Sequence, residues 1–265
     1  MALVPALVLL LASGCRNNVW ERAGWPVPAS DRGSRALGFW QGSMIAALCV
    51  GALVIGLILW SAIRFRRRGP GDLPRQVRYN LPIEVLYTAV PVIIVSILFY
   101  FTVIRENDEN NLNVKPDLRV GVVGYQWSWR FNYLDDGLSV NGAVGKPPTL
   151  VLPVGKEVEF YEDSPDVIHS FWVVNFLFKR DVIPGRTNKF EVRVTRPGLF
   201  RGFCAEYCGI NHDRMLFWVR AVPFAQYQNW LSQAKADAQA NNGNSQYTVY
   251  SGPTTPSFDS VRNLS

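Results

Sequence analysis

The chain has 265 residues, of which 48% are hydrophobic and 18% are charged, so it is more apolar and less charged than an average soluble domain. The net charge of +6 is concentrated in residues 64–80, which hold six Arg and one Asp, whereas from residue 105 onward 17 Lys and Arg balance 17 Asp and Glu. Because the excess basic residues lie between two apolar segments, the charge excludes a nucleic-acid-binding surface and indicates a membrane topology.

The first 15 residues form a short apolar run that ends in small residues and Cys15. This run is too short to cross a bilayer and is typical of the core of a signal peptide. Its ending, Leu-Ala-Ser-Gly-Cys, resembles a bacterial lipobox, in which the cysteine becomes the lipidated first residue. No Lys or Arg precedes the run, so an uncleaved N-terminus is the alternative. Residues 16–38 are then expected to be an extracytoplasmic segment.

Two apolar segments follow, at residues 39–63 and 81–104. The first has 25 residues without a charge, enough to cross a hydrocarbon core of roughly 30 Å at about 1.5 Å per residue. The second is charged only at Glu84. Since arginine-rich loops between spans stay in the cytoplasm, the loop 64–80 is predicted to be cytoplasmic and both termini to lie outside. The sequence therefore predicts a two-helix transmembrane hairpin, 39–104, with a large domain on the outer face of the membrane.

From Pro116 the chain changes to short runs rich in Val, Phe, Tyr and Trp, separated by Gly and Pro. Closely spaced short strands with turn residues between them predict a β-sandwich or barrel, not a parallel α/β sheet. The strands are expected at 118–123, 149–152, 157–161, 168–174, 189–194 and 215–221. This domain is placed at residues 105–222, followed by a helix at 223–240 and a flexible polar tail at 241–265.

The residues most informative about chemistry are two thiols, an imidazole and a thioether within twelve positions: Cys204, Cys208, His212 and Met215. The chain has one other histidine, His169. Thiolate and thioether ligands combined with imidazole favour copper. A mononuclear blue-copper site uses two histidines, one cysteine and a weak axial methionine, so this set has one thiolate more than such a site requires. Two bridging thiolates would let two copper ions share these ligands, with each ion keeping one histidine.

Three other readings of the same residues stay open at this point. A Cys2His2 zinc site would use both cysteines and both histidines, although it would leave the Met215 thioether without a role. In an oxidising compartment Cys204 and Cys208 would instead form a disulfide, which gives no reason for the histidines. Met215 by itself is most simply a core side chain.

The run from Cys204 to Met215, C-A-E-Y-C-G-I-N-H-D-R-M, resembles the copper-A motif C-x-E-x-C-G-x-x-H-x-x-M of the cytochrome c oxidase subunit II family. Three further segments are similar to signatures of that family: 124–130 (GYQWSWR), 181–186 (DVIPGR) and 196–200 (RPGLF). Together with the hairpin, the resemblance covers roughly residues 39–222. It implies a membrane protein whose extracytoplasmic domain is an all-β, cupredoxin-like sandwich that carries a binuclear copper centre.

The metal ligands that the resemblance implies are His169, Cys204, Glu206, Cys208, His212 and Met215. In the family pattern the two cysteines bridge both copper ions and each histidine binds one ion. The methionine and the Glu206 backbone carbonyl are weak ligands, one to each ion. The Glu206 carboxylate would point toward a magnesium ion shared with subunit I. Asp166, three residues before His169, is a candidate hydrogen-bonding partner for that histidine, and a turn-capping role is its alternative.

The resemblance also gives roles to two residues that bind no metal. Trp127 matches the tryptophan through which electrons enter, an exposed ring between the docked cytochrome and the copper. The alternative for Trp127 is packing in the sandwich core, and Ser128 departs from the tyrosine usual in the family. Glu84 resembles the glutamate at the mouth of a proton-uptake channel. Its alternative is an interfacial glutamate whose carboxylate reaches water.

Five acidic residues lie shortly before His169, and they suggest a docking patch for a basic cytochrome: Glu157, Glu159, Glu162, Asp163 and Asp166. The alternative is a solvated loop. The function implied by the resemblance is that of an electron-entry subunit. It would take electrons from cytochrome c, and pass them to the haems and copper of subunit I, in a proton-pumping oxidoreductase that also contains subunit III.

The expected location is a bacterial plasma membrane, spanned by both helices, with the copper domain on the outer face and no nucleic-acid partner. Three other classes of protein remain to be distinguished. A quinol oxidase subunit II lacks the copper ligands, and a nitrous-oxide reductase lacks the membrane hairpin. A non-catalytic or zinc-binding lipoprotein would contain no copper.

Overall fold

The computed structural model describes residues 22, 24–67, 69, 77–112, 115–241 and 245–252. The chain divides into two compact units. One contains Gly38–Asn107, and the other, called the β-domain below, contains Trp25–Leu37 together with the chain from Asp108 onward. The predicted signal peptide and lipobox, with Cys15, lie outside the described residues, as does most of the central part of the arginine-rich loop.

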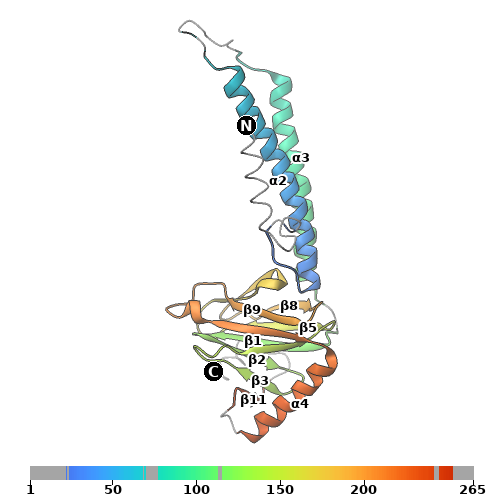
Figure 1. Ribbon diagram of the computed structural model, residues 1–265, viewed down its shortest axis with the longest axis vertical. Coiled ribbons are helices and arrows are strands. Elements are labelled where there is room, and N and C mark those ends of the chain that lie inside the picture. Colours follow the sequence, from blue (N-terminus) through green and yellow to red (C-terminus); the bar gives the residue numbers. More distant parts are fainter. Residues whose placement is uncertain are drawn as a thin grey trace, which may run out of the picture. The chain divides into compact units, whose positions relative to one another are not determined.

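Two helices are long and apolar enough to cross a membrane, α2 (Asp31–Arg64) and α3 (Leu81–Asn110) (Figure 1). With 34 residues, α2 is about 51 Å long and begins eight residues before the apolar span expected from the sequence. The early start has a local cause. Ser30 caps the helix, because its Oγ accepts a hydrogen bond of 2.9 Å from the backbone N–H of Gly33.

The last turn of α3 extends six residues beyond the predicted span, into a charged segment. The guanidinium of Arg32 stabilises this end, because it donates to the backbone carbonyl of Asp108 and, at 2.8 Å, to that of Asn111. The carbonyls at the end of a helix have no partner within the helix, so a cation placed there is favourable. Arg32 also lies 3.5 Å from the fully buried carboxylate of Glu191. These contacts all lie within the β-domain, which contains both of these helix ends.

The β-domain is a sandwich of two sheets, which confirms the predicted fold class (Figure 1). One sheet has six strands in the order β11-β3-β2-β1-β5-β8, and the other has five in the order β4-β10-β9-β6-β7. The strands are β1 (Leu118–Tyr125), β2 (Ser128–Tyr133), β3 (Leu138–Asn141), β4 (Thr149–Pro153), β5 (Glu157–Asp163), β6 (His169–Val173), β7 (Phe178–Val182), β8 (Asn188–Arg193), β9 (Gly198–Cys204), β10 (Leu216–Val222) and β11 (Tyr247–Val249).

Each sheet mixes both strand directions, since β1 pairs with β5, and β10 with β4, in parallel, while the other pairs are antiparallel. Between the sheets lies an aromatic core. The rings of Phe171 and Phe217 are stacked with centroids 4.8 Å apart, and those of Phe160 and Phe190 likewise at 4.8 Å. Large rings on alternate positions of facing strands bury much apolar area, and this burial orients the strand ends that carry the candidate metal ligands.

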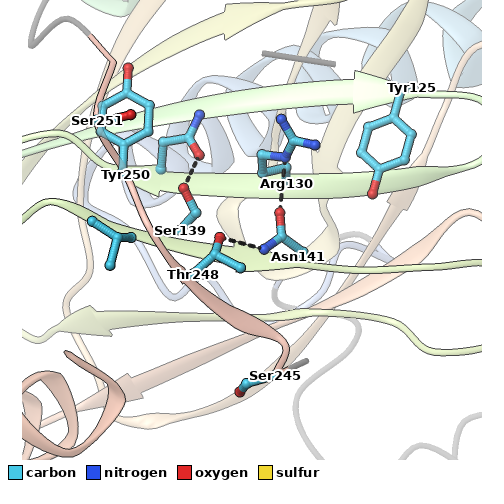
Figure 2. Close-up of a pocket in the computed structure, with 10 residues that line it drawn as sticks. Tyr125, Arg130, Ser139, Asn141, Ser245, Thr248, Tyr250 and Ser251 are labelled. Carbon is cyan, nitrogen blue, oxygen red and sulfur yellow. Dashed lines mark hydrogen bonds between the residues drawn. The ribbon is translucent and has the colours of Figure 1, made fainter. Parts of the chain in front are cut away.

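The C-terminal helix α4 (Phe224–Ala240) lies beside β3 and β11 (Figure 1). Residues 241–265 were expected to be a flexible tail, but Tyr247–Val249 forms the edge strand β11, paired antiparallel with β3. The strand is held by side chains as well as backbone. Asn141 donates to the hydroxyl of Thr248 at 2.9 Å (Figure 2), and the ring of Tyr247 packs edge-on against Trp230. The β-branched and aromatic residues of this short run favour a strand despite its polar surroundings.

Candidate metal centre

Five side chains that are separated by up to 46 positions converge at one end of the sandwich. His169 begins β6, Cys204 ends β9, and Met215 immediately precedes β10. Between them, Cys208 lies in the connecting loop and His212 begins a single turn of 3-10 helix. The backbone N–H of Cys204 donates to the carbonyl of Met215 at 3.0 Å, which closes this loop as the continuation of the β9–β10 hairpin.

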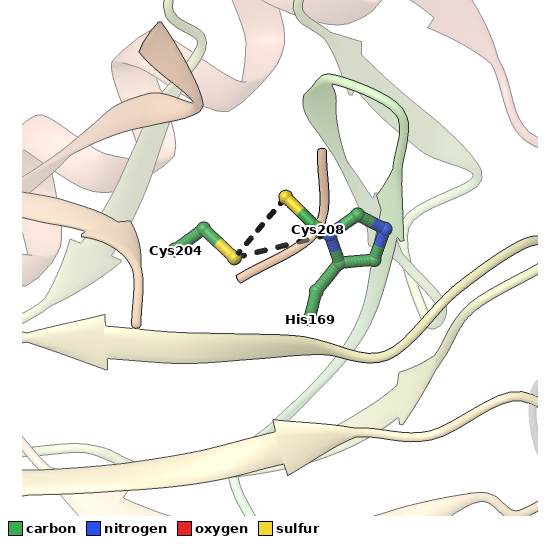
Figure 3. Close-up of side chains that lie close together, drawn as sticks. All are labelled: His169, Cys204 and Cys208. Carbon is green, nitrogen blue, oxygen red and sulfur yellow. Dashed lines mark hydrogen bonds between the residues drawn. The ribbon is translucent and has the colours of Figure 1, made fainter. Parts of the chain in front are cut away.

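The sulfur and imidazole atoms lie at the separations expected of groups that share metal ions. The Sγ atoms of Cys204 and Cys208 are 3.9 Å apart, and His169 Nδ1 is 3.8 Å from Cys204 Sγ (Figure 3). His212 Nδ1 is 3.6 Å, and Met215 Sδ 3.8 Å, from Cys208 Sγ. A disulfide would bring the two sulfurs to about 2.05 Å, so both thiols are free.

Three of the donor atoms form a tighter group than the rest. The donor atoms of His169, Cys204 and Cys208 all lie within 4.8 Å of one another, and all three side chains are buried. His212 lies on the side of Cys208, with its Nδ1 3.6 Å from Cys208 Sγ. The two imidazoles are therefore at different ends of the thiol pair, one beside each cysteine.

His169 is held in place by the loop that precedes it. Its Nε2 lies 2.9 Å from Oδ1 of Asp166, so Nδ1 is left to face Cys204. This contact confirms the partner that the sequence suggested. The other carboxylate oxygen of Asp166 accepts a 2.7 Å hydrogen bond from the backbone N–H of Gln126, which ties the β5–β6 loop to the β1–β2 turn. Burial alone would raise the pKa of Asp166, but hydrogen bonds from Gln126, His169 and Val167 together lower it.

Two side chains of the β1–β2 turn form hydrogen bonds with the loop between Cys204 and Met215. The carbonyl of Cys208 accepts hydrogen bonds from Gln126 Nε2 at 2.8 Å and from Trp127 Nε1 at 3.1 Å. Gly209 makes room for the indole: its φ is +123°, and a Cβ there would lie 3.0 Å from Trp127 Nε1. Trp127, expected to be exposed, is half-buried for this reason. The role of Gln126 was not predicted, although the sequence places it beside Trp127 in the aromatic run.

Burial also decides the protonation of the site. Burial, together with the neighbouring Cys204 thiol, raises the pKa of Cys208 to about 12. Burial lowers the pKa of His169, so its ring is neutral at pH 7. Metal binding requires neutral imidazoles and deprotonated thiols. Loading the site with metal would therefore release protons from the cysteines.

The remaining predicted site residues lie elsewhere. The backbone carbonyl of Glu206 faces the cluster, 3.2 Å from Cys204 Sγ, while its side chain is exposed. Glu84 lies in the first turn of α3, where its Oε1 accepts a 2.9 Å hydrogen bond from the backbone N–H of Asn80. Asn80 Oδ1 in turn accepts from the N–H of Ile83, so Glu84 belongs to a reciprocal helix cap.

The acidic residues before His169 do not form the exposed docking patch that the sequence suggested. Four of the five are buried in β5: Glu157, Glu159, Glu162 and Asp163. Glu157 pairs with Arg193 at 2.8 Å, and Asp163 accepts hydrogen bonds from the hydroxyl of Thr187. Neither carboxylate oxygen of Glu162 has a hydrogen-bonding partner among the described residues, and burial raises its pKa well above 4.5. All seven residues of β5 are buried, so its acidic side chains are covered on both faces of the strand, which a count of charges does not reveal.

Comparison with known proteins gives a consistent result. Residues 146–222 match the sequence model of the family described as "Cytochrome C oxidase subunit II, periplasmic domain". The chain is 46% identical over 277 residues to "Probable cytochrome c oxidase subunit 2" of Streptomyces coelicolor, covering 90% of this chain and 87% of the relative. It is 34% identical over 326 residues to "Cytochrome c oxidase subunit 2" of Mycobacterium tuberculosis H37Rv, covering 98% and 88%.

Among solved structures, the periplasmic domain of subunit II of cytochrome oxidase (CoxB) of Bradyrhizobium japonicum is similar, with 32% identity and a TM-score of 0.43. That match covers 48% of this chain and 99% of the other. The relatives from Streptomyces and Mycobacterium align over 90% and 98% of this chain, at identities of 46% and 34%. The chain belongs to the cytochrome c oxidase subunit II family.

Proposed function

We propose that this protein is the electron-entry subunit of a cytochrome c oxidase. It would accept electrons from cytochrome c at a binuclear copper centre and pass them to the oxygen-reducing site of subunit I. The observation that carries the proposal is the pairing in the candidate metal centre, where each of two free thiols has its own imidazole Nδ1 at 3.6–3.8 Å.

The geometry favours two metal ions over one. A tetrahedral Cys2His2 zinc site uses four donor atoms around one ion. Here each imidazole has a different thiol as its neighbour, and the thioether of Met215 adds a fifth donor beside Cys208. Two ions that share the thiols of Cys204 and Cys208, each held by one imidazole, would account for this arrangement.

The donor set favours copper over zinc. Met215 is fully buried with its Sδ 3.8 Å from Cys208 Sγ, so a thioether faces the centre, and thioethers are ligands for copper and not for zinc. The backbone carbonyl of Glu206 would complete the set on the side of Cys204, from which it is 3.2 Å away. Copper ions bound by these groups would accept and release one electron at a time.

The chain's own residues keep this centre in one geometry. Asp166 fixes the tautomer and the orientation of His169, while Gln126 and Trp127 bind the carbonyl of Cys208. A site whose ligands are fixed by hydrogen bonds and core packing reorganises little when its charge changes, which favours rapid electron transfer. Trp127 would be the entry point, because its indole N–H is bonded to the backbone of one of the bridging cysteines.

Two acidic side chains would serve the rest of the complex. The exposed carboxylate of Glu206 would contribute to a magnesium site shared with subunit I. Glu84 would lie at the entrance of a proton-uptake path into subunit I, from its position at the start of α3. The chain would be inserted in a bacterial plasma membrane by α2 and α3, with the β-domain outside and subunits I and III as neighbours. Lipidation of Cys15 would add a further anchor.

The proposal is tested with the intact oxidase purified from membranes that carry either the natural chain or the C208S variant. Reduction of the haems by cytochrome c is followed in a stopped-flow experiment. We expect the C208S complex to keep its haem content and to lose the rapid phase of haem reduction. The C49S variant, which changes an exposed cysteine in α2, is the matched control and should behave like the natural complex. Rapid haem reduction in C208S would contradict the proposal.

A further inference from the structure

The outer face of the five-stranded sheet carries aromatic and basic side chains on neighbouring strands. Alternation along each strand sends these residues away from the core, and together they define the aromatic-basic face: Trp172, Lys179, Leu199, Arg201, Trp218 and Arg220. Leu199 is 60% exposed and Trp218 is 36% exposed. Water-exposed apolar groups of this size, gathered on one face, indicate an interaction surface.

The strand register makes the face continuous. Trp172 on β6 pairs with Lys179 on β7, Arg201 on β9 pairs with Trp218 on β10, and Leu199 pairs with Arg220. Directly opposed residues on one face of a sheet lie about 4.5–5.5 Å apart at Cβ, so each cation lies beside an apolar or aromatic neighbour. The metal ligands are separate from this face, because Cys204 follows its outward-pointing neighbour on β9 and points inward.

The cations of this face lack anionic partners. Within the described part of the chain, Lys179, Arg201 and Arg220 make no ion pair. Elsewhere in the same domain cations are neutralised by contact, as in the pairs Lys156–Asp117 (3.0 Å), Arg193–Glu157 (2.8 Å) and Lys235–Asp136 (2.9 Å). The aromatic-basic face also holds one exposed acidic residue, Asp181, so it carries three positive charges against one negative.

The outer face of the other sheet is different. There Asn132 accepts a 2.7 Å hydrogen bond from Ser139, and Arg130 donates to Asn141 at 2.9 Å (Figure 2). These residues line a polar cavity of about 410 Å³, which water can fill. Because these polar groups form hydrogen bonds with one another, they do not require hydrogen bonds from a partner protein.

An apolar cavity of about 340 Å³ adjoins the aromatic-basic face and shares Trp172 and Lys179 with it. Its other walls are Trp25, Pro26, Val174, Leu177 and Phe178. The ring of Trp172 is held against Phe203 in an edge-on contact with centroids 4.6 Å apart, which keeps this wall in place. A pre-formed apolar hollow, next to arginines that make no ion pair within the described part of the chain, has the composition of a protein interface hot spot, which is rich in Trp and Arg around a pocket.

We propose that the aromatic-basic face docks a neighbouring protein whose surface is acidic and which places an apolar side chain in this cavity. Carboxylates of the partner would pair with Lys179, Arg201 and Arg220, and its apolar groups would cover Leu199 and Trp218. A protein fits better than a lipid surface, because the hollow accepts a single shaped side chain and the cations alternate with apolar and aromatic residues across the paired strands.

The experiment places a photo-crosslinking benzophenone amino acid at position 199, in the full chain within native membranes. The matched control places it at Lys189, an exposed position on the six-stranded sheet. After irradiation and solubilisation in mild detergent, crosslinked peptides are identified by mass spectrometry. We expect position 199 to be joined to an Asp- and Glu-rich segment of another protein, and position 189 not to be. This result does not depend on which metal the chain carries, so it fails or succeeds separately from the proposed function.

The second part of the experiment tests charge-reversal variants of the two arginines. R201E/R220E should lower the yield of the crosslink from position 199 about tenfold, while R201K/R220K and K189E should leave it unchanged. An unchanged melting temperature shows that the variants stay folded. The proposal would be overturned by crosslinks from position 199 only to lipid, only to residues 1–21 of the same chain, or to no molecule at all. A yield unaffected by charge reversal would overturn it equally.

Discussion

Oδ1 of Asp166 lies 2.9 Å from Nε2 of His169, and this contact determines which edge of the ring faces the thiols. Because the Nε2–H group donates a hydrogen bond to the carboxylate, Nδ1 keeps a lone pair directed at Cys204, whose Sγ is 3.8 Å away. The same carboxylate accepts the backbone N–H of Gln126, beside the proposed electron-entry residue Trp127. One side chain therefore couples the metal centre to the proposed entry point.

The first prediction concerns this carboxylate. D166N should weaken copper retention about 10- to 100-fold, because the amide no longer fixes the tautomer and basicity of His169. The measurement is competition with a copper chelator of known affinity. D213N, which changes an exposed aspartate in the loop between Cys204 and Met215, is the control and should leave affinity unchanged. Equal affinities for D166N and the natural chain would show that Asp166 only shapes the turn.

The second prediction concerns electron entry at Trp127. W127A should slow reduction of the chain by cytochrome c by about tenfold or more, roughly 1.4 kcal/mol in the barrier, without changing the copper content. W127F should be intermediate, since it keeps a ring but loses the 3.1 Å hydrogen bond to the Cys208 carbonyl. Stopped-flow kinetics measure the rate of reduction, with W218F, at an exposed tryptophan on β10, as the control. A normal rate in W127A would assign the residue to packing alone.

The third prediction uses the buried carboxyl of Glu162. Burial raises its pKa well above 4.5, so above that pH the unfolded chain ionises Glu162 more readily than the folded chain does. The contribution of Glu162 to the free energy of unfolding is therefore fully present below about pH 4.5 and declines as the pH rises. E162Q should therefore be more stable than the natural chain at pH 8 and show a flatter dependence on pH. Thermal unfolding from pH 5 to 9 measures this, with exposed Asp237→Asn as the control; parallel curves would contradict it.

The fourth prediction concerns the Arg32–Glu191 pair, whose side chains are 7% and 0% exposed. Removing either charge leaves the other buried without this ion pair, so R32Q and E191Q should each lower the free energy of unfolding by about 3–5 kcal/mol. The double variant should lose less than the sum of the two. Urea unfolding in detergent measures all three, and R220Q, at an exposed position, should change stability by less than about 0.5 kcal/mol. Strict additivity would argue against a coupled pair.

The hairpin, the sandwich and the grouping of the candidate ligands could be predicted because each follows from a local pattern. Apolar length indicates a span, and short β-rich runs indicate strands. The spacing from Cys204 to Met215 places four donors in one loop. That His169 joins them, across 35 positions, was suggested by ligand chemistry and by the family resemblance, since no local rule brings β6 beside the end of β9.

Other features depend on long-range contacts that a sequence does not display. The extension of α3 to Asn110 depends on Arg32, which lies almost 80 positions earlier. The strand β11 requires an unfilled edge on β3, and its sequence alone is too short to signal it. Glu157 and Asp163 resembled a docking patch because charge is normally exposed, but their partners Arg193 and Thr187 let them be buried.

The proposed binuclear copper centre is tested most directly by the metal content and the EPR spectrum of the full chain, loaded with copper and purified in detergent. Two thiolates that each have their own imidazole predict two copper ions per chain and the multi-line signal of one unpaired electron shared by both ions. A single zinc ion, or one copper ion with a localised signal, would contradict a binuclear copper centre.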